Sequence, residues 1–491
     1  ANAALTGSVV VEQGTMILGS AASLGTNAGG LVVQSGATVN LNNITLGADE
    51  TVSLAGTGVA GFAATGNATI QGAVILTGDA TIGDSADTRI NFGTNAEPIN
   101  LIGGSSTLTK AGISRIWYRG VANGAGNSLG ALVINGGTFG IETYDNALGS
   151  VPVTVNTGGI LSAWANGPGT LPTTQSTIIT LNGGTLSSAF AGQTWTGPIT
   201  LAADSSLSDA ANAQNFTITN VISESGGSRG LTKTQTSTVT LSGVNTYTGN
   251  TTVNAGTIDL AATGGLKFVI GANGVNNKVT GAGTAALNGT FTLDLTGAAI
   301  ADGNSWTLVD TTTKSFGTTF AVSGFTKSGT IHTLVDGNNT WTFDEATGAL
   351  SLDVAQGYTS WVDGFGLAAG DKDPTDDPDA DGFNNLMEYV LGGNPATGST
   401  SIAPTGAKSG SDFILTFSRN DLAQAGGDVA ITVEYGNDLS VWGSVAVPAA
   451  SGTVGSVNFS ITDGSPNDTV AATIPTSGAP KFFARVKGVK P

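Results

Sequence analysis

The sequence predicts an all-β protein built around a parallel β-solenoid, also called a β-helix. A short strand–corner–strand phrase recurs along the chain, with clear copies beginning at Leu132, Val153, Ile179 and Thr252. Recurrence of this kind indicates one structural unit stacked on itself. Gly accounts for 74 of the 491 residues and charged residues for only 11%, which is typical of many short strands joined by tight corners.

The corners of this phrase set the size of each coil. They recur about every 20–26 residues, as between Asn135 and Asn156 and between Asn156 and Asn182, and such an interval holds one coil of a β-helix. Gly and Asn suit the corners because they adopt positive φ more readily than branched residues do. We expect Val, Ile, Leu and Ala inside the stack, with Thr, Ser, Asn and Gln outside it.

A longer string repeats at 231–260 and, less completely, at 108–140. Both copies begin Leu-Thr-Lys, and the former continues as Thr238-Val-Thr-Leu-Ser-Gly-Val-Asn-Thr-Tyr-Thr-Gly-Asn-Thr-Thr-Val-Asn-Ala-Gly-Thr-Ile. This string resembles the autotransporter-associated β-strand repeat, or passenger-associated transport repeat, of bacterial surface proteins. The resemblance implies a right-handed parallel β-helix exported to the cell surface. Because Lys110 and Lys233 recur within the repeat, we expect them to bond turn carbonyls or a neighbouring coil.

Three regions are expected along the chain. Residues 1–357 form the parallel β-helix, with bulkier aromatic closing coils at 291–354. Residues 358–398 form a linker with an EF-hand-like calcium loop and a short helix, and residues 399–491 form a small antiparallel β-sandwich. The closing coils are needed because an uncovered solenoid end recruits other chains. The aromatic side chains expected in this closing layer are Trp306, Phe320, Phe325, Trp341 and Phe343.

The last region alternates apolar and polar residues as antiparallel strands do. Strands are expected at 413–418, 429–435, 456–461, 469–474 and 482–486. The segments that begin at Val433 and Phe482 resemble C-terminal modules that follow β-helices in secreted bacterial proteins. This resemblance implies a β module and assigns no binding residues.

One motif between the two β regions has a specific chemical meaning. Residues 377–388 fit the twelve-residue calcium loop D-x-D-x-D-G-x5-E, in which alternate carboxylates converge on one hard cation. The predicted ligands are Asp377, Asp379, Asp381, the Phe383 carbonyl, Asn385 and Glu388. The loop resembles dockerin and thrombospondin type 3 calcium loops. We expect a structural calcium ion that stiffens the joint between domains; the alternative is a solvated acidic linker.

A weaker candidate site lies within the solenoid region. Arg115, Trp117, Tyr118 and Arg119 place two aromatic rings between two cations, a combination that can stack on a sugar or hold an anionic glycan. The alternative interpretation is a structural cluster packed over a turn.

Catalysis is not expected, and we interpret the chain as a protein that is not an enzyme. His332 is the only histidine, so a Ser-His-Asp triad has one possible base. Asp84, Asp87 and Arg89 are candidates for the polar groove of a polysaccharide lyase, although turn residues that bond their own backbone explain them as well. The sparse charge of residues 1–357 argues against a catalytic groove.

Composition limits the cellular locations and the binding partners that we expect for this protein. A net charge of −18 repels phosphate backbones and anionic lipids, so neither nucleic acid nor direct membrane insertion is expected. Cysteine is absent, which excludes disulfide and thiol chemistry. The opening Ala1-Asn-Ala-Ala without Met predicts an exported protein whose signal peptide has been removed. We therefore expect it outside a bacterial cell or on the cell surface.

These features predict a secreted structural protein. The apolar, β-prone segment Leu5–Leu18 has no aromatic cap. We expect it either to add to an open edge or to insert into the C-terminal sandwich of the next copy by strand addition, which gives a head-to-tail homopolymer in a fibre or surface layer. The alternative is an adhesin that binds glycans through Trp117, Tyr118, Trp164 and Trp195. A polysaccharide lyase or hydrolase is a third, weaker alternative.

Overall fold

The chain divides into two compact units. The computed structural model describes residues 5–25, 29–56, 61–63, 66–84, 86–164, 173–209, 214–336, 339–354 and 357–490, with only the backbone for 61–63 and 84. Unit 1 comprises residues 1–299, 305–333 and 343–351, and unit 2 comprises 300–304, 334–342 and 352–491. Helix accounts for only 7% of the structure, so the predicted all-β class is confirmed.

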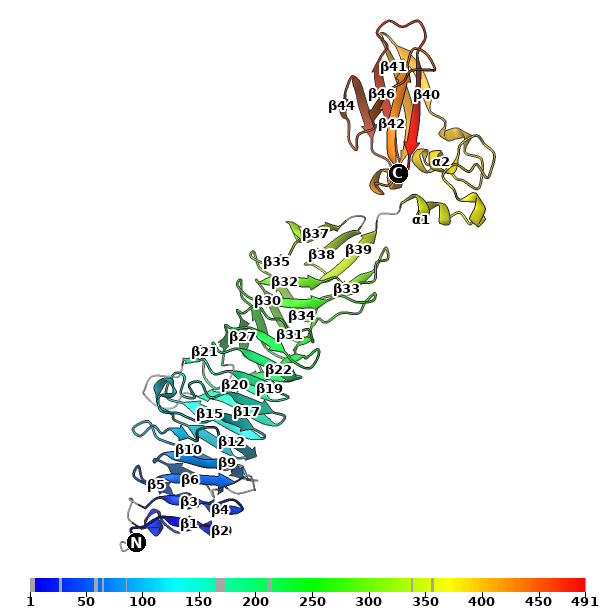
Figure 1. The fold of residues 1–491 in the computed structure, drawn as a ribbon. Coiled ribbons are helices and arrows are strands. Elements are labelled where there is room, and N and C mark those ends of the chain that lie inside the picture. The colour runs from blue at the N-terminus through cyan, green and yellow to red at the C-terminus, as the bar shows by residue number, and fades with distance from the viewer. Residues whose placement is uncertain are drawn as a thin grey trace. The chain divides into compact units, whose positions relative to one another are not determined.

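Unit 1 is a β-solenoid, as predicted, and it has about 11 turns. Figure 1 shows it as a stack of strands coloured from blue to green. One wall is an eleven-stranded parallel sheet in which each strand pairs with its counterpart in the next coil. In spatial order its strands are β1 (Val9–Val11), β3 (Leu31–Val33), β6 (Val52–Gly56), β9 (Val74–Asp84), β12 (Thr107–Gly112), β14 (Ala131–Ile134), β16 (Val153–Asn156), β19 (Ile179–Asn182), β22 (Ile199–Ala203) and β25 (Ile222–Glu224), with β11 (Leu101–Ile102) also on β9.

Two further parallel ladders make the other walls and meet at the long strand β31 (Val279–Leu287), which pairs with β34 (Val309–Phe316). The longer ladder runs through β5 (Thr45–Leu46), β8 (Asn67–Ile70), β10 (Arg89–Phe92), β13 (Arg115–Tyr118), β15 (Gly137–Glu142), β17 (Gly159–Trp164), β20 (Thr185–Ser188), β23 (Ser205–Asp209), β26 (Leu231–Lys233) and β28 (Thr251–Val253). The shorter ladder runs through β18 (Thr174–Gln175), β21 (Gln193–Trp195), β24 (Phe216–Ile218), β27 (Thr238–Leu241) and β29 (Thr257–Leu260).

Short sheets and helical turns complete the coils. The small parallel sheets contain β2 (Gly14–Ile17), β4 (Ala37–Asn40) and β7 (Gly61–Ala63) in one case, and β30 (Gly265–Val269), β32 (Thr290–Asp294) and β35 (Ala321–Val322) in the other. The 3₁₀ turns of unit 1 are η1 (Ala21–Leu24) and η2 (Ala122–Gly124).

The core of unit 1 forms because the parallel register stacks apolar residues of one coil on apolar residues of the next. Val153 aligns with Ile179, and Ile179 aligns with Ile199 in the next coil. All three side chains are buried, and burying such a side chain contributes about 1.5–3 kcal/mol. The corners are also in register. The side-chain nitrogen of Asn156 donates to Asn135 Oδ1 at 2.6 Å, and the side-chain nitrogen of Asn182 donates to Asn156 Oδ1 at 2.8 Å. The predicted corner positions thus form an asparagine ladder.

The predicted aromatic closing layer is present, with one exception. A five-stranded sheet contains β33 (Ser305–Thr307), β39 (Ala349–Val354), β38 (Asn339–Asp344), β37 (Ile331–Asp336) and β36 (Thr326–Ser328). Phe291, Phe320 and Phe343 pack with ring centroids 4.8–5.9 Å apart. Trp306 and Trp341 are also buried. Phe325 is only half-buried, because it lies in the turn just before β36.

In its described residues, unit 2 contains two antiparallel sheets and three short helices. The larger sheet has the order β40 (Thr405–Ser409), β41 (Asp412–Asn420), β46 (Asn467–Pro475), β45 (Val457–Thr462) and β44 (Gly452–Val454), and the smaller has β43 (Gly443–Ala446), β42 (Ala430–Gly436) and β47 (Phe483–Val489). The helices are α1 (Tyr358–Asp363), α2 (Asn385–Leu391) and α3 (Asp421–Ala425), with 3₁₀ turns η3 (Ala369–Asp371) and η4 (Thr400–Ile402).

The strands expected in the C-terminal region correspond to β41, β42, β45, β46 and β47, and the prediction of antiparallel pairing is confirmed. One core joins both sheets to α1 and α2. The region expected to be a linker therefore contributes buried side chains to this module. None of the helices in the described residues is long and apolar enough to cross a membrane.

Candidate metal centre and other predicted site residues

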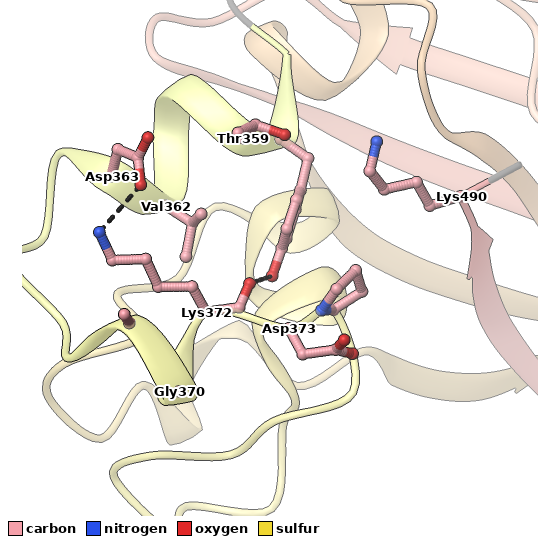
Figure 2. A pocket seen from close by; sticks show the side chains of 10 residues that line it. Thr359, Val362, Asp363, Gly370, Lys372, Asp373 and Lys490 are labelled. Carbon is pink, nitrogen blue, oxygen red and sulfur yellow. Dashed lines mark hydrogen bonds and ion pairs between the residues drawn. The ribbon is translucent and has the colours of Figure 1, made fainter.

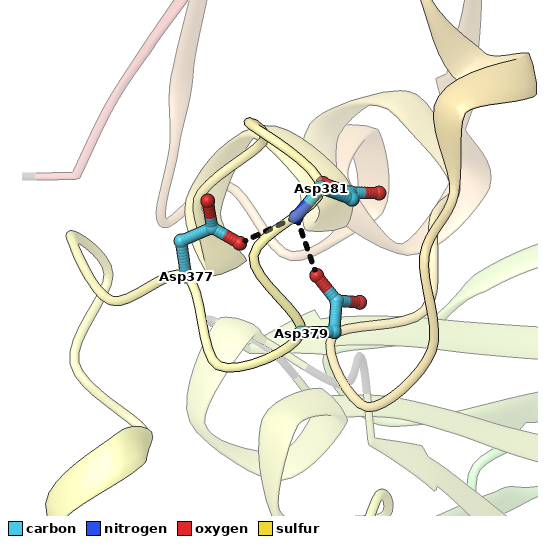
Figure 3. Close-up of side chains that lie close together, drawn as sticks. All are labelled: Asp377, Asp379 and Asp381. Atoms are coloured by element: carbon cyan, nitrogen blue, oxygen red, sulfur yellow. Dashed lines mark hydrogen bonds between the residues drawn. The ribbon is translucent and has the colours of Figure 1, made fainter.

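The three aspartates of the predicted calcium loop lie together. Ligand oxygens of Asp377, Asp379 and Asp381 are all within 4.8 Å of one another, and Figure 3 shows their carboxylates around the turn. The Asp381 amide donates to Asp377 Oδ1 and to Asp379 Oδ1, each at 3.2 Å. Gly382 has a φ of +93°, a conformation that glycine adopts without strain. The spacing of the motif therefore produces a tight acidic turn, as the sequence predicts.

The last residue of the motif is buried beside this turn. Glu388 is 0% exposed. Its carboxylate oxygens have no hydrogen-bond partner at ordinary geometry, and polar groups of Ser399 and Asn394 lie near enough to offset part of the burial. Asp379 Oδ2 is likewise buried without a hydrogen-bond partner. A buried carboxylate normally has a partner, because leaving it unpaired costs more than leaving a neutral group unpaired. These oxygens are thus available to a cation.

Electrostatics at the turn favour an added positive charge. Burial raises the pKa of Glu388 to about 7, the charges of Asp379 and Asp381 reinforce the shift, and polar groups of Ser399 and Asn394 partly offset it. Burial also raises the pKa of Asp379, with a further contribution from the neighbouring aspartates. Like charges held close in a partly dry environment repel one another. A divalent cation would relieve both the burial and the repulsion.

Helix α2 fixes the position of Glu388. The helix begins where the Asn384 side chain accepts a hydrogen bond from the Met387 amide at 2.9 Å, a standard N-cap. It ends at Gly392, whose φ of +79° permits a left-handed C-cap. Leu391 is the last helical residue. The apolar side of α2 faces the core of unit 2, and this places Glu388 in the interior.

The other two predicted ligands lie next to the turn. The Asn385 side-chain nitrogen donates to the carbonyls of Asp371 and Asp373, both at 2.9 Å. Asn385 therefore ties the loop to the preceding segment, a role that the motif alone does not indicate. The Phe383 amide donates to Asp381 Oδ1 at 2.8 Å, and its ring packs partly buried against the core of unit 2.

The weaker candidate site is mostly interior. Trp117 is 4% exposed, Tyr118 0% and Arg119 6%. The Tyr118 hydroxyl donates to the carbonyl of Ile99 and to Asn127 Oδ1. Only Arg115 of the four faces solvent, where it pairs with Asp87 at 2.9 Å. The four residues thus stabilise the stack, and their rings offer no open face for a sugar.

Trp117 is buried for a reason that lies in the next coil. Its register partner in β15 is Gly140, and a Cβ at that glycine would lie 1.9 Å from the indole ring. The ring also lies 4.9 Å from Trp164 and 5.4 Å from the Arg89 guanidinium. The missing side chain of Gly140 therefore makes room for an indole on the outer wall.

The remaining candidates also have structural partners. Arg119 pairs with the buried Glu142, and Arg89 lies 3.6 Å from the same carboxylate. The side chain of Asp84 lies outside the described residues. His332 is 1% exposed, and its Nε2 lies 2.7 Å from Glu345 Oε1. Trp195, an adhesin candidate, is fully buried.

Two lysines lie inside the solenoid, and the prediction of a structural role is confirmed. Lys110 is 0% exposed, and its ammonium donates to the carbonyls of Ala111, Gly112 and Gly136 at 2.7–3.0 Å. Burial lowers the pKa of Lys110 to about 8. Lys233 has the same burial and a pKa also lowered to about 8. The hydrogen bond from Lys110 to the Gly136 carbonyl joins one corner to the corner of the next coil.

The second lysine repeats the pattern. Lys233 donates to the carbonyls of Thr234, Gln235 and Ala255, of which the last belongs to the following coil. The lysine of the repeat is thus a corner-bonding residue.

A surface pocket of about 560 Å³ lies in unit 2 near the loop. Figure 2 shows that α1, the η3 turn and Lys490 line it. Lys372 pairs with Asp363 at 2.9 Å, and Lys490 lies 3.5 Å from Asp428. Because both lysines already have acidic partners, the pocket provides no surplus positive charge for an anionic ligand.

Comparison with protein families gives one match. Residues 231–260 match the passenger-associated-transport-repeat, and the matched segment contains the corner-bonding Lys233. Comparisons with curated proteins and with solved structures give no significant match. The matched repeat and the β-solenoid together point to a β-helical bacterial protein that is secreted or held at the cell surface.

Proposed function

We propose that this chain is a secreted structural protein of bacteria that binds a calcium ion at residues 377–388 and assembles head to tail into a fibre or surface layer. The observation that carries the calcium site is Glu388, buried and unpaired beside three converging aspartates. Carboxylate oxygens in this number suit Ca²⁺, a hard cation that takes 6–8 oxygen ligands. Bound there, calcium would neutralise the turn and hold its oxygens in place.

The calcium proposal predicts a measurable affinity. We expect calorimetric titration of the whole protein to give one site per chain with a Kd of about 10⁻⁴–10⁻³ M, the range of extracellular calcium modules. Asp379→Asn should weaken binding at least tenfold, because it removes one charged ligand. Asp371→Asn is the matched control, since Asp371 is exposed and offers only its carbonyl to Asn385. Absence of binding heat in the wild-type protein up to 10 mM calcium would count against the site.

The assembly proposal starts from the first coil. Among the described residues, β1 pairs only with β3, and β2 pairs only with β4. Val10 and Ile17 on these strands are 46% and 65% exposed. An edge strand with apolar side chains readily pairs with another chain. The other end of the solenoid carries the aromatic closing layer, so the two ends differ.

The partner that we propose for this edge is the C-terminal module of a second copy. Within the described residues β40 and β47 are the longest edge strands of the two sheets of unit 2. Strand addition joins an edge to an edge through main-chain hydrogen bonds. Because the contact uses different surfaces on the two copies, repeated contacts give a filament unless rotation closes a ring.

Purified protein tests this directly. In millimolar calcium and at high concentration, we expect filaments by negative-stain electron microscopy and a rising mass by light scattering. Val10→Lys together with Ile17→Lys should keep the protein monomeric, because edge lysines block strand addition. Val244→Lys together with Val275→Lys, at residues of similar exposure farther along unit 1, should still assemble. Wild-type protein that stays monomeric, or an edge variant that polymerises normally, would refute the proposal.

A further inference from the structure

The helix that leaves the acidic turn is part of the core of unit 2. Tyr389 of α2 is fully buried, and its ring lies 5.7 Å from Tyr358 and 5.1 Å from Trp361. Its hydroxyl donates to the Leu422 carbonyl at 2.9 Å. Val390 and Leu391 are also fully buried and belong to the same core as both sheets. The fold of the module therefore depends on where α2 sits.

The same helix carries the unpaired carboxylate. Glu388 and Tyr389 are both fully buried when α2 is docked. Polar groups of Ser399 and Asn394 offset only part of this burial, and the carboxylate faces the charges of Asp379 and Asp381. An unpaired buried charge opposes the burial of its own helix. Docking of α2 without a cation is thus electrostatically unfavourable.

The acidic turn is joined to segments on both sides. Asp381 accepts a hydrogen bond from the Ser399 amide, and the Gly393 amide donates to the Glu388 carbonyl at 2.8 Å. The Asn385 amide donates to the Asp376 carbonyl at 2.8 Å. A cation held by the turn would therefore fix the chain before the loop, the loop itself and the chain after α2.

We propose that calcium at this site is a folding component of unit 2, which docks α2 against the two sheets only when the cation is bound. This rests on the calcium site proposed above. Calcium would then act less on a joint between domains than on the core of the module itself. The solenoid of unit 1 has its own hydrogen-bonded core and folds without the ion. The protein would accordingly keep α2 docked in its C-terminal module mainly where free calcium is abundant, as it is outside cells.

The experiment uses the full chain with and without calcium chloride, after chelator treatment, and follows two readouts. Differential scanning calorimetry should show a transition of unit 2 that rises by about 10 °C at calcium near one hundred times its Kd, because a ligand specific for the folded state shifts the equilibrium about one hundredfold. Hydrogen exchange followed by mass spectrometry should show α2 amides protected in calcium and exposed without it. Amides of β16 and β19 should exchange alike in both conditions.

Glu388→Gln separates charge burial from packing. Without calcium this variant should melt above the wild-type protein, because a neutral amide of nearly the same shape replaces the unpaired charge. With calcium this variant should melt below the wild type, and it should bind calcium at least tenfold more weakly. Asp371→Asn should behave as the wild type does in both conditions.

The outcomes distinguish the two proposals. If calorimetric titration detects no calcium binding, the metal site and this inference both fail. If calcium binds but neither the unit 2 transition nor α2 exchange responds, the metal site stands and the inference is overturned. A calcium-free Glu388→Gln protein that melts below the calcium-free wild type would also overturn it. Should the variant not fold, exchange in the wild-type protein alone still decides.

Discussion

Replacing Lys110 with Met is expected to lower the free energy of unfolding of the solenoid by about 3–5 kcal/mol. The ammonium donates to three backbone carbonyls inside the stack, and each buried acceptor left without a partner costs about 1–3 kcal/mol. Methionine fills much of the same volume. The loss of stability should therefore come from the missing hydrogen bonds more than from a cavity. Thermal unfolding followed by calorimetry measures the change.

The matched control for Lys110→Met is Thr109→Val. Thr109 neighbours Lys110 on β12, and its side chain points outward, so this change should stay within about 0.5 kcal/mol of the wild type. Lys233→Met should reproduce the loss, since the second repeat uses the same contacts. If both lysine variants unfold at the wild-type temperature, the corner-bonding role assigned to the repeat is wrong.

Replacing Arg419 with Met is expected to destabilise unit 2 by about 3–5 kcal/mol, the usual cost of breaking a buried ion pair at one side. Arg419 is 2% exposed, donates to Asp468 Oδ2 at 2.5 and 3.2 Å, and donates to the Pro448 carbonyl at 2.6 Å. Its loss leaves the Asp468 charge buried on β46. Chemical denaturation of unit 2 measures the change.

The stability lost in Arg419→Met should depend on pH in a defined direction. Hydrogen bonds from Arg419 hold the pKa of Asp468 below its ordinary value. The pair therefore stabilises the folded state fully above the unfolded-state pKa of about 3.9, and this contribution is lost as pH falls through the lower folded value. The gap between wild type and Arg419→Met should be widest near pH 7 and narrow in acid. The double variant Arg419→Met with Asp468→Leu should recover much of the loss; a double variant no more stable than the single one would contradict the assignment.

The solenoid was predictable because its signal is repeated. Each corner such as Asn156 follows the previous one at a nearly constant interval, and the parallel register turns that interval into direct contact. The buried lysines were predictable for the same reason. Trp117 was not, because strand alternation places it outside, and its burial depends on Gly140 in the next coil. Contacts between coils outside the repeated phrase leave no trace in local sequence.

The C-terminal region shows the same limit. Its five longer strands carry clear alternation, whereas β40, β43 and β44 are short edge strands with mostly exposed side chains. Because such strands lack an apolar face, their sequence pattern predicts loops. For the acidic loop, the spacing predicted that Asp377, Asp379 and Asp381 lie together. It did not predict that Tyr389 and Leu391 would join the module's core, because the partners of α2 lie on strands far along the chain.

The parallel pairing of the coils has a consequence for how such a protein changes length. Each inner coil of unit 1 is hydrogen-bonded to the coil before it and the coil after it, so its stability depends mainly on those two neighbours. Duplicating one whole coil, for example residues 153–178, would present the same interfaces to both sides. Gene duplication could therefore lengthen or shorten this protein by whole turns while its first coil and closing layer stay unchanged.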